Sequence, residues 1–299
     1  MDDLRAALKT AQEQGRIVIL GHDAPDVDSL VSCALFKALC GFWGIEAEIV
    51  ISDVPDEQSR RVLPHFGIHP DEWIGRIEPG DQLVLVDHHQ TTHPGRIAVC
   101  VDHHPTACPP EADFVWIGAS GACGRMVLTL MERAGMPLTR EHRALAVCAL
   151  YLDTIALRSA KILPEEAEWA RQETKSLGLD AAWMEQEGAN LCDMTRPAEE
   201  LATFGKKTYD FGGHRVISTY VQTDAMTAER LEAILAVLRR SVREEAACLW
   251  VFLVHDPIAG RSFEYDISPD GSVEKTAYDQ LISRGKTVMP QVEKRFYKD

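Results

Sequence analysis

Four short runs of Asp and His residues follow, or lie within, apolar segments of this sequence. They are residues 22–29 (His-Asp-Ala-Pro-Asp-Val-Asp-Ser), Asp87-His88-His89, Asp102-His103-His104 and Leu152-Asp153-Thr154. A carboxylate or imidazole beside buried apolar chain is costly unless it is paired or bound to a metal ion. Asp oxygen and His nitrogen without thiolate suit Mn²⁺, Mg²⁺, Co²⁺ or Fe²⁺ better than a closed structural zinc site. The residue types therefore indicate a site for divalent cations.

The apolar segments around these runs predict the elements that position them. We expect strands at 16–20, 46–52, 82–86, 96–101 and 114–117, and helices at 29–39, 123–134 and 140–157. Asp28 or Ser29 is the expected N-cap of the first of these helices. Strands alternating with helices predict an α/β fold with a doubly wound, mostly parallel sheet covered on both faces.

The carboxyl ends of such strands are where ligands bind. At least four carboxylates would meet at that edge, and two divalent ions would offset their repulsion. A carboxylate can bridge two ions about 3.5–4 Å apart, the arrangement of two-metal phosphoryl hydrolysis.

The 299 residues predict about two domains. Residues 193–197 are the expected linker, and the pattern changes after them. Strands at 207–211, 215–222, 248–254 and 262–267, a helix at 227–243 and an irregular to helical segment at 278–296 indicate a smaller α+β domain. The predicted domains are 1–192 and 198–299.

The composition of the chain favours some classes of binding partner over others. The net charge of -15 disfavours a polyanion at long range, so no stable nucleic-acid partner is expected, whereas a small anionic substrate is compatible. No apolar run is long enough to cross a bilayer and no leader is recognised at Met1, so a cytoplasmic location without a membrane partner is expected. The eight cysteines form no CxxC pair. Cys33, Cys148 and Cys248 lie in apolar runs and are expected to be buried.

The motifs resemble those of the DHH phosphoesterase superfamily, and more narrowly the manganese-dependent (family II) inorganic pyrophosphatases and the related exopolyphosphatases. Six stretches carry the resemblance: residues 21–29 (Gly-His-Asp-Ala-Pro-Asp-Val-Asp-Ser), Val86-Asp87-His88-His89, Asp102-His103-His104, residues 152–159 (Leu-Asp-Thr-Ile-Ala-Leu-Arg-Ser), and, in the second domain, Lys207–Gly212 and Ser283–Pro290. The matches cover nearly the whole chain in order. The fold implied is a DHH domain followed by a substrate-binding domain, with the active site in the cleft between them.

The resemblance also implies roles for single residues. One metal ion would be held by His22, Asp26 and Asp87, and the other by Asp28, Asp87, His103 and Asp153, so that Asp87 bridges them. His104 would act as general acid or orient the substrate. Phosphates would be bound from the second domain by Lys207, Arg284 and Lys286. The ions implied are Mn²⁺, with Co²⁺ or Mg²⁺ as alternatives.

The activity implied is hydrolysis of phosphoanhydride bonds in pyrophosphate or short polyphosphate, with a hydroxide bridging the two ions as nucleophile. Three departures from the family pattern bear on the substrate: His89 replaces an Asn, Gly285 replaces a Lys, and Asp23-Ala24 alters the first loop. Two alternatives remain, a phosphodiesterase for short oligonucleotides or cyclic dinucleotides, and a non-catalytic regulatory relative. A homodimer is compatible with the family.

The residues before the predicted helix at 123–134 are compatible with two roles. Gly118-Ala119-Ser120-Gly121 precedes a predicted helix. Such a run can cradle an anion at the helix N-terminus or be a plain connector.

Overall fold

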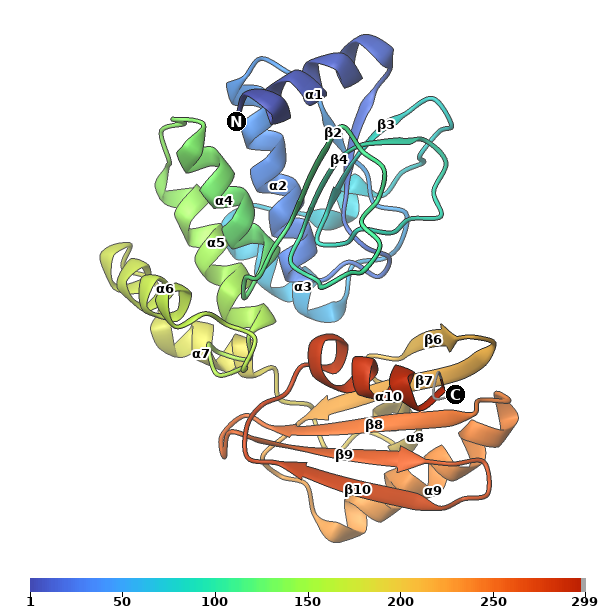
Figure 1. Cartoon of the computed structure of the whole chain (residues 1–299). Coiled ribbons are helices and arrows are strands. Elements are labelled where there is room, and N and C mark those ends of the chain that lie inside the picture. Colours follow the sequence, from blue (N-terminus) through green and yellow to red (C-terminus); the bar gives the residue numbers. More distant parts are fainter. Residues whose placement is uncertain (297–299) are drawn as a thin grey trace. The chain divides into compact units, whose positions relative to one another are not determined.

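The computed structural model describes residues 1–296 and divides into two compact units (Figure 1). The first unit comprises residues 1–157 and 162–188, and the second comprises residues 158–161 and the chain from Ala189 onward. The expected domain bounds of 1–192 and 198–299 stay predictions. None of the helices in residues 1–296 is both long and apolar enough to cross a membrane.

The first unit is built on a five-stranded parallel sheet. Its strand order is β2-β1-β3-β4-β5, and every neighbouring pair runs parallel. The strands are β1 (Ile17–Leu20), β2 (Glu48–Ile49), β3 (Gln82–Val86), β4 (Arg96–Asp102) and β5 (Phe114–Ile117). Buried strands rich in Val, Ile and Leu are typical of a parallel sheet, and the predicted fold class is confirmed.

Helices cover one face of this sheet in a single large core. Alternate strand residues such as Ile19, Val84 and Val101 belong to that core, whereas their neighbours Leu20 and Leu85 face a smaller apolar cluster on the other side. Helices α2, α4 and α5 pack against one another beside the sheet (Figure 1). The helices are α1 (Asp2–Gln14), α2 (Val27–Phe42), α3 (Glu57–Val62), α4 (Cys123–Arg133), α5 (Arg140–Asp153), α6 (Pro164–Ser176) and α7 (Ala181–Ala189), with short turns η1 (Leu63–Phe66) and η2 (Pro70–Trp73).

The start of α2 differs from the prediction. Neither Asp28 nor Ser29 is its N-cap, because the helix begins at Val27 and Asp26 caps it. The Asp26 Oδ1 atom accepts a hydrogen bond from the Ser29 backbone N–H at 3.1 Å. Asp28 therefore lies inside the first turn, and its side chain is free for another role.

The second unit is built on a mixed five-stranded sheet of order β10-β9-β8-β7-β6, in which only the β7–β8 pair runs parallel. The strand β10 has no counterpart in the prediction. The elements of the second unit are β6 (Lys207–Phe211), β7 (His214–Gln222), β8 (Leu249–Asp256), β9 (Arg261–Ile267), β10 (Val273–Tyr278), α8 (Ala198–Thr203), α9 (Ala228–Glu244), η3 (Arg284–Val288) and α10 (Met289–Phe296).

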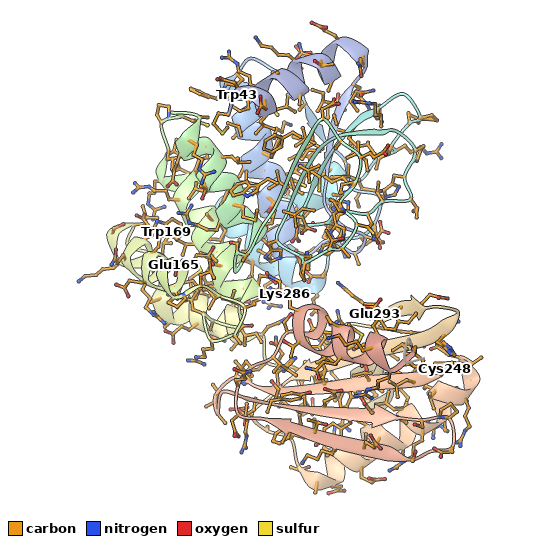
Figure 2. All side chains as sticks on the ribbon, in the orientation of Figure 1. Trp43, Glu165, Trp169, Cys248, Lys286 and Glu293 are labelled. Atoms are coloured by element: carbon orange, nitrogen blue, oxygen red, sulfur yellow. The ribbon has the colours of Figure 1, made fainter. Side chains whose placement is uncertain are left out.

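The cysteine prediction holds for two of the three residues. Cys33 and Cys148 are buried, but Cys248, labelled in Figure 2, is exposed. Cys248 immediately precedes β8, and its neighbours Ala247 and Leu249 are both buried. Because side chains alternate along extended chain, the residue between two inward-facing ones points outward.

Candidate metal centre

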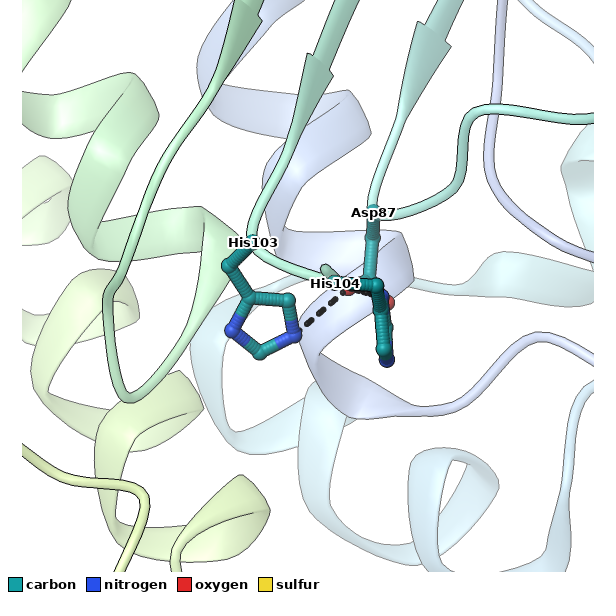
Figure 3. Close-up of side chains that lie close together, drawn as sticks. All are labelled: Asp87, His103 and His104. Atoms are coloured by element: carbon teal, nitrogen blue, oxygen red, sulfur yellow. Dashed lines mark ion pairs between the residues drawn. The ribbon is translucent and has the colours of Figure 1, made fainter. Parts of the chain in front are cut away.

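Asp87 lies at the centre of the site. It follows β3 in the left-handed backbone region (φ 63°), and its backbone N–H donates to the Val101 carbonyl at 3.0 Å. Its side chain is 2% exposed. The Oδ2 atom lies 3.5 Å from His22 Nε2, and the Oδ1 atom lies 3.2 Å from His103 Nε2 (Figure 3). The two carboxylate oxygens thus face two different groups of side chains.

The first cluster consists of His22, Asp26 and Asp87, which offer ligand atoms within 4.8 Å of one another. His22 Nε2 lies 3.5 Å from Asp26 Oδ2 and 3.5 Å from Asp87 Oδ2. The other ring nitrogen, Nδ1, lies 2.7 Å from the Asp23 carbonyl oxygen. A carbonyl only accepts, so the hydrogen is on Nδ1 and the lone pair of Nε2 is directed at the carboxylates.

The second cluster consists of Asp28, His103 and Asp153, again within 4.8 Å. His103 Nε2 lies 3.8 Å from Asp28 Oδ2 and 3.6 Å from Asp153 Oδ2, besides its approach to Asp87. His103 Nδ1 donates to the Ser120 carbonyl oxygen at 3.1 Å. This is the same tautomer as His22, with Nε2 left as the ligand atom.

The N-terminus of α4 holds Asp28. The Cys123 and Gly124 backbone N–H groups donate to Asp28 Oδ2 at 2.7 Å and Oδ1 at 2.8 Å. A Cβ atom on Gly124 would lie 3.2 Å from Asp28 Oδ1 and 3.1 Å from Val31 and Ala149, so glycine allows the close approach. The group held at this helix N-terminus is thus the side chain of Asp28, and its donors belong to α4 itself rather than to residues 118–121.

The electrostatics of the two clusters match divalent cations. Burial raises the pKa of Asp28 well above its usual value, and the charges of Asp87, Asp153 and Asp26 raise it further. Burial would also raise the pKa of Asp87, but the nearby His103 ring outweighs burial and lowers the pKa. The buried Asp87 Oδ1 atom has no hydrogen-bond donor of good geometry. A buried acceptor without a donor is costly, and a bridging pair of cations would satisfy it.

The turn that follows Asp153 is strained. Ile155, Ala156 and Leu157 all have positive φ, between 52° and 60°. Such strain accumulates where the surroundings fix a functional group. Gly188 of α7 packs against this turn so closely that a Cβ atom there would lie 2.5 Å from the Tyr151 carbonyl oxygen. The end of α5, which carries Asp153, is therefore held in place by α7.

Asp102 links two histidines beside the clusters. Its Oδ1 atom lies 2.9 Å from His104 Nδ1, and its Oδ2 atom lies 2.5 Å from His89 Nδ1. The Asp102 side chain is fully buried, which would raise its pKa, but hydrogen bonds from His104 and His89 outweigh burial and hold the pKa well below the usual range. The ionised carboxylate only accepts, so both Nδ1 atoms carry the hydrogen.

His104 is thereby oriented toward the first-unit carboxylates. Its Nδ1 atom lies 3.8 Å from Asp87 Oδ1, and its side chain is 39% exposed (Figure 3). This leaves Nε2 as the ring atom through which His104 can act on a ligand.

The structure thus brings together seven of the ten predicted site residues. The remaining three lie in the second unit: Lys207 on β6, and Arg284 and Lys286 in η3. Arg284 lies over the Tyr220 ring at 5.2 Å and donates to the Gly205 carbonyl at 2.5 Å. Their contact with a ligand stays a prediction.

Several supporting residues were not predicted from the sequence. Asp102 and His89 belong to quoted motifs but had no role assigned, and Gly124 is signalled only by the small residues around it. Gly188 lies outside every motif, and no sequence signal identifies it.

Comparison with known proteins agrees with this geometry. Residues 16–156 match the DHH family, N-terminal domain. A protein of Lactococcus lactis subsp. lactis (strain IL1403), named "Probable manganese-dependent inorganic pyrophosphatase", is 26% identical, and the alignment covers 95% of this chain and 99% of that protein. The resemblance drawn from the motifs is confirmed.

Two solved structures share the fold. The Methanococcus jannaschii protein described as a "putative family II inorganic pyrophosphatase" aligns with a TM-score of 0.75 at 20% identity, over 94% of this chain and all of that one. An exopolyphosphatase-related protein of Bacteroides fragilis aligns with a TM-score of 0.52 at 14% identity, over 90% of this chain and 84% of that one. At such identities the likeness concerns the fold alone.

Proposed function

We propose that this chain, which contains a DHH-family N-terminal domain and resembles manganese-dependent inorganic pyrophosphatases along most of its length, hydrolyses phosphoanhydride bonds with two divalent metal ions. The observation that carries the proposal is Asp87, whose two oxygens face the two clusters separately and whose Oδ1 atom is buried without a hydrogen-bond donor. A carboxylate between two ligand sets is what a two-ion phosphohydrolase requires.

The residues present fit this role. His22, Asp26 and Asp87 would hold one ion, and Asp28, Asp87, His103 and Asp153 the other. The donor set of carboxylate oxygen and imidazole nitrogen suits Mn²⁺, with Co²⁺ or Mg²⁺ as alternatives. When bound, the two metal ions would supply an activated water and neutralise charge on the phosphoryl oxygens.

The protein's own groups do the rest. Asp102 fixes the proton of His104 on Nδ1, so His104 Nε2 can hold a second proton and give it to the leaving oxygen. Lys207, Arg284 and Lys286 bind substrate phosphates in this proposal. The proposed substrate is pyrophosphate or short polyphosphate. A cytoplasmic location and a homodimer are two further predictions.

The proposal is tested by phosphate release in the presence of Mn²⁺, Co²⁺ or Mg²⁺. Pyrophosphate, tripolyphosphate and longer chains are compared with a short oligonucleotide and a cyclic dinucleotide. We expect release from at least one phosphoanhydride. Nucleotide products alone would favour a phosphodiesterase, and no turnover of any substrate by protein that binds two ions would favour a regulatory relative.

Asp102→Asn tests the role given to His104. An amide cannot accept hydrogen bonds from two imidazoles through both of its atoms, so His104 loses its fixed orientation. Because general acid catalysis contributes roughly 10²–10⁴-fold, we expect kcat to fall about 10- to 100-fold. Mn²⁺ affinity should change little, because Asp102 is not in either cluster. An unchanged kcat would contradict this role. So would a variant whose only defect is weaker Mn²⁺ binding and whose kcat is normal at saturating metal.

A further inference from the structure

A buried carboxylate on α6 contacts the loop that supports the second cluster. Glu166, in the first turn of α6, is 9% exposed. Its Oε1 atom accepts the Ser120 hydroxyl at 2.5 Å, and its Oε2 atom accepts the Gly121 backbone N–H at 2.7 Å and the Leu163 backbone N–H at 3.3 Å. This glutamate therefore joins the start of α6 to residues 120–122, the loop before α4.

The 120–122 loop contacts His103 and α5 directly and reaches Asp28 through α4. The Ser120 carbonyl oxygen accepts His103 Nδ1–H at 3.1 Å. The loop leads into the α4 N–H groups that hold Asp28. A Cβ atom on Gly121 would lie 2.9 Å from Leu150 and 3.0 Å from Thr154, residues of α5 and its C-cap beside Asp153. The loop is thus joined to His103 by a hydrogen bond, to the end of α5 by close packing and to the Asp28 donors through the chain.

The first cluster is held by other parts of the chain. His22 is oriented by the Asp23 carbonyl oxygen through Nδ1 and by Ser29 Oγ, which accepts the His22 backbone N–H at 3.1 Å. Asp26 is fixed as the N-cap of α2. A displacement of the 120–122 loop would therefore act chiefly on the second cluster.

We infer that Glu166 is a positioning residue for the second metal ion: by anchoring the 120–122 loop, it sets the affinity of the Asp28–His103–Asp153 cluster without contacting an ion or substrate. Buried hydrogen-bond partners behind a ligand contribute to metal affinity because they orient it. The inference rests on the proposed two-ion site.

The test is Glu166→Gln, assayed by titrating metal-free protein with Mn²⁺ and measuring free Mn²⁺ by electron paramagnetic resonance. The amide places an N–H₂ group against the Ser120 hydroxyl or the Gly121 N–H, where a carboxylate oxygen accepted. We expect one of the two ions to bind about 10- to 100-fold more weakly and the other to change by less than about twofold. The matched control is Glu173→Gln on the same helix, whose carboxylate pairs with Arg143 and should leave both affinities unchanged.

Double variants identify the affected cluster. Asp153→Asn weakens the second cluster directly, so combining it with Glu166→Gln should give less than the sum of the two effects. Combining Glu166→Gln with Asp26→Asn, in the first cluster, should give additive effects. If the effects of Glu166→Gln and Asp153→Asn on Mn²⁺ affinity were additive instead, Glu166 would not act through the second cluster, and the inference would be overturned.

Measuring both the unfolding temperature and the Mn²⁺ affinities distinguishes a positioning role of Glu166 from a purely structural one. A purely structural glutamate would lower the unfolding temperature with both Mn²⁺ affinities intact, and that result would overturn the inference. If Glu166→Gln does not fold, Ser120→Ala removes the hydroxyl that joins Glu166 to the loop but keeps the carbonyl that holds His103, and it should weaken the same ion. Wild-type protein that binds fewer than two ions would overturn the proposed function itself.

Discussion

Asp87→Asn is expected to abolish hydrolysis and to weaken both metal ions together. Asp87 is buried, and its two oxygens face His22 and His103 on either side. Removing one charged partner from a buried ionic set costs roughly 3–5 kcal/mol, which corresponds to an affinity loss of about 10²- to 4 × 10³-fold for each ion. Because the proposed reaction needs both ions, turnover at fixed Mn²⁺ should fall further than either affinity.

The substitution changes charge with little change of shape. Asparagine, like aspartate, tolerates the left-handed conformation found at Asp87 better than most non-glycine residues, so the backbone should keep its course. Asp71→Asn, which removes an exposed partner of Arg60, is the control for loss of one carboxylate. A variant that lost only one ion, with the other unaffected, would show that Asp87 does not bridge the clusters.

The clusters are predictable from the sequence because their residues lie at fixed positions relative to strands. His22, Asp87 and His103 follow β1, β3 and β4, which are neighbours in one parallel sheet. Strands of this kind are recognised by their unbroken apolar runs, and the residues after them must meet at one edge. Hydrophobic patterning and chain direction therefore carry the information that brings distant carboxylates together.

The supporting contacts are not predictable in the same way. Glu166 bonds a loop more than forty residues earlier in the chain, and nothing in a polar helical stretch distinguishes it from the exposed glutamates around it. The left-handed turn at Ile155–Leu157 contains no glycine, the residue that normally signals positive φ. Both features depend on which helix packs against which loop, and this packing cannot be predicted from the local sequence pattern.

The missed strand has a related cause. Most side chains of β10 are exposed, and the strand lies at the edge of the second sheet. An edge strand with little burial has no apolar alternation by which to recognise it. Its place is determined by pairing with β9.

Mn²⁺ binding is expected to strengthen as the pH rises, with the largest effect at the second cluster. Burial and then the charges of Asp87, Asp153 and Asp26 raise the pKa of Asp28, so in the metal-free protein this carboxyl keeps its proton above the usual carboxyl range. An ion that takes Asp28 as a ligand must displace that proton. Below the raised pKa, the apparent affinity should therefore increase about tenfold per pH unit for each proton released.

The same shift determines how stability responds to metal. Because the folded-state pKa of Asp28 lies above the unfolded value, its contribution to folding is present at low pH and is lost as the pH rises through the raised pKa. Bound Mn²⁺ offsets that loss by pairing with the carboxylate, so the increase in unfolding temperature on adding Mn²⁺ should grow as the pH rises above the usual carboxyl range. Thermal unfolding of metal-free and Mn²⁺-loaded protein at each pH measures this difference. A difference that stays constant or shrinks as the pH rises would mean that Asp28 is already ionised without metal, and that the carboxylates do not need the ions to offset their repulsion.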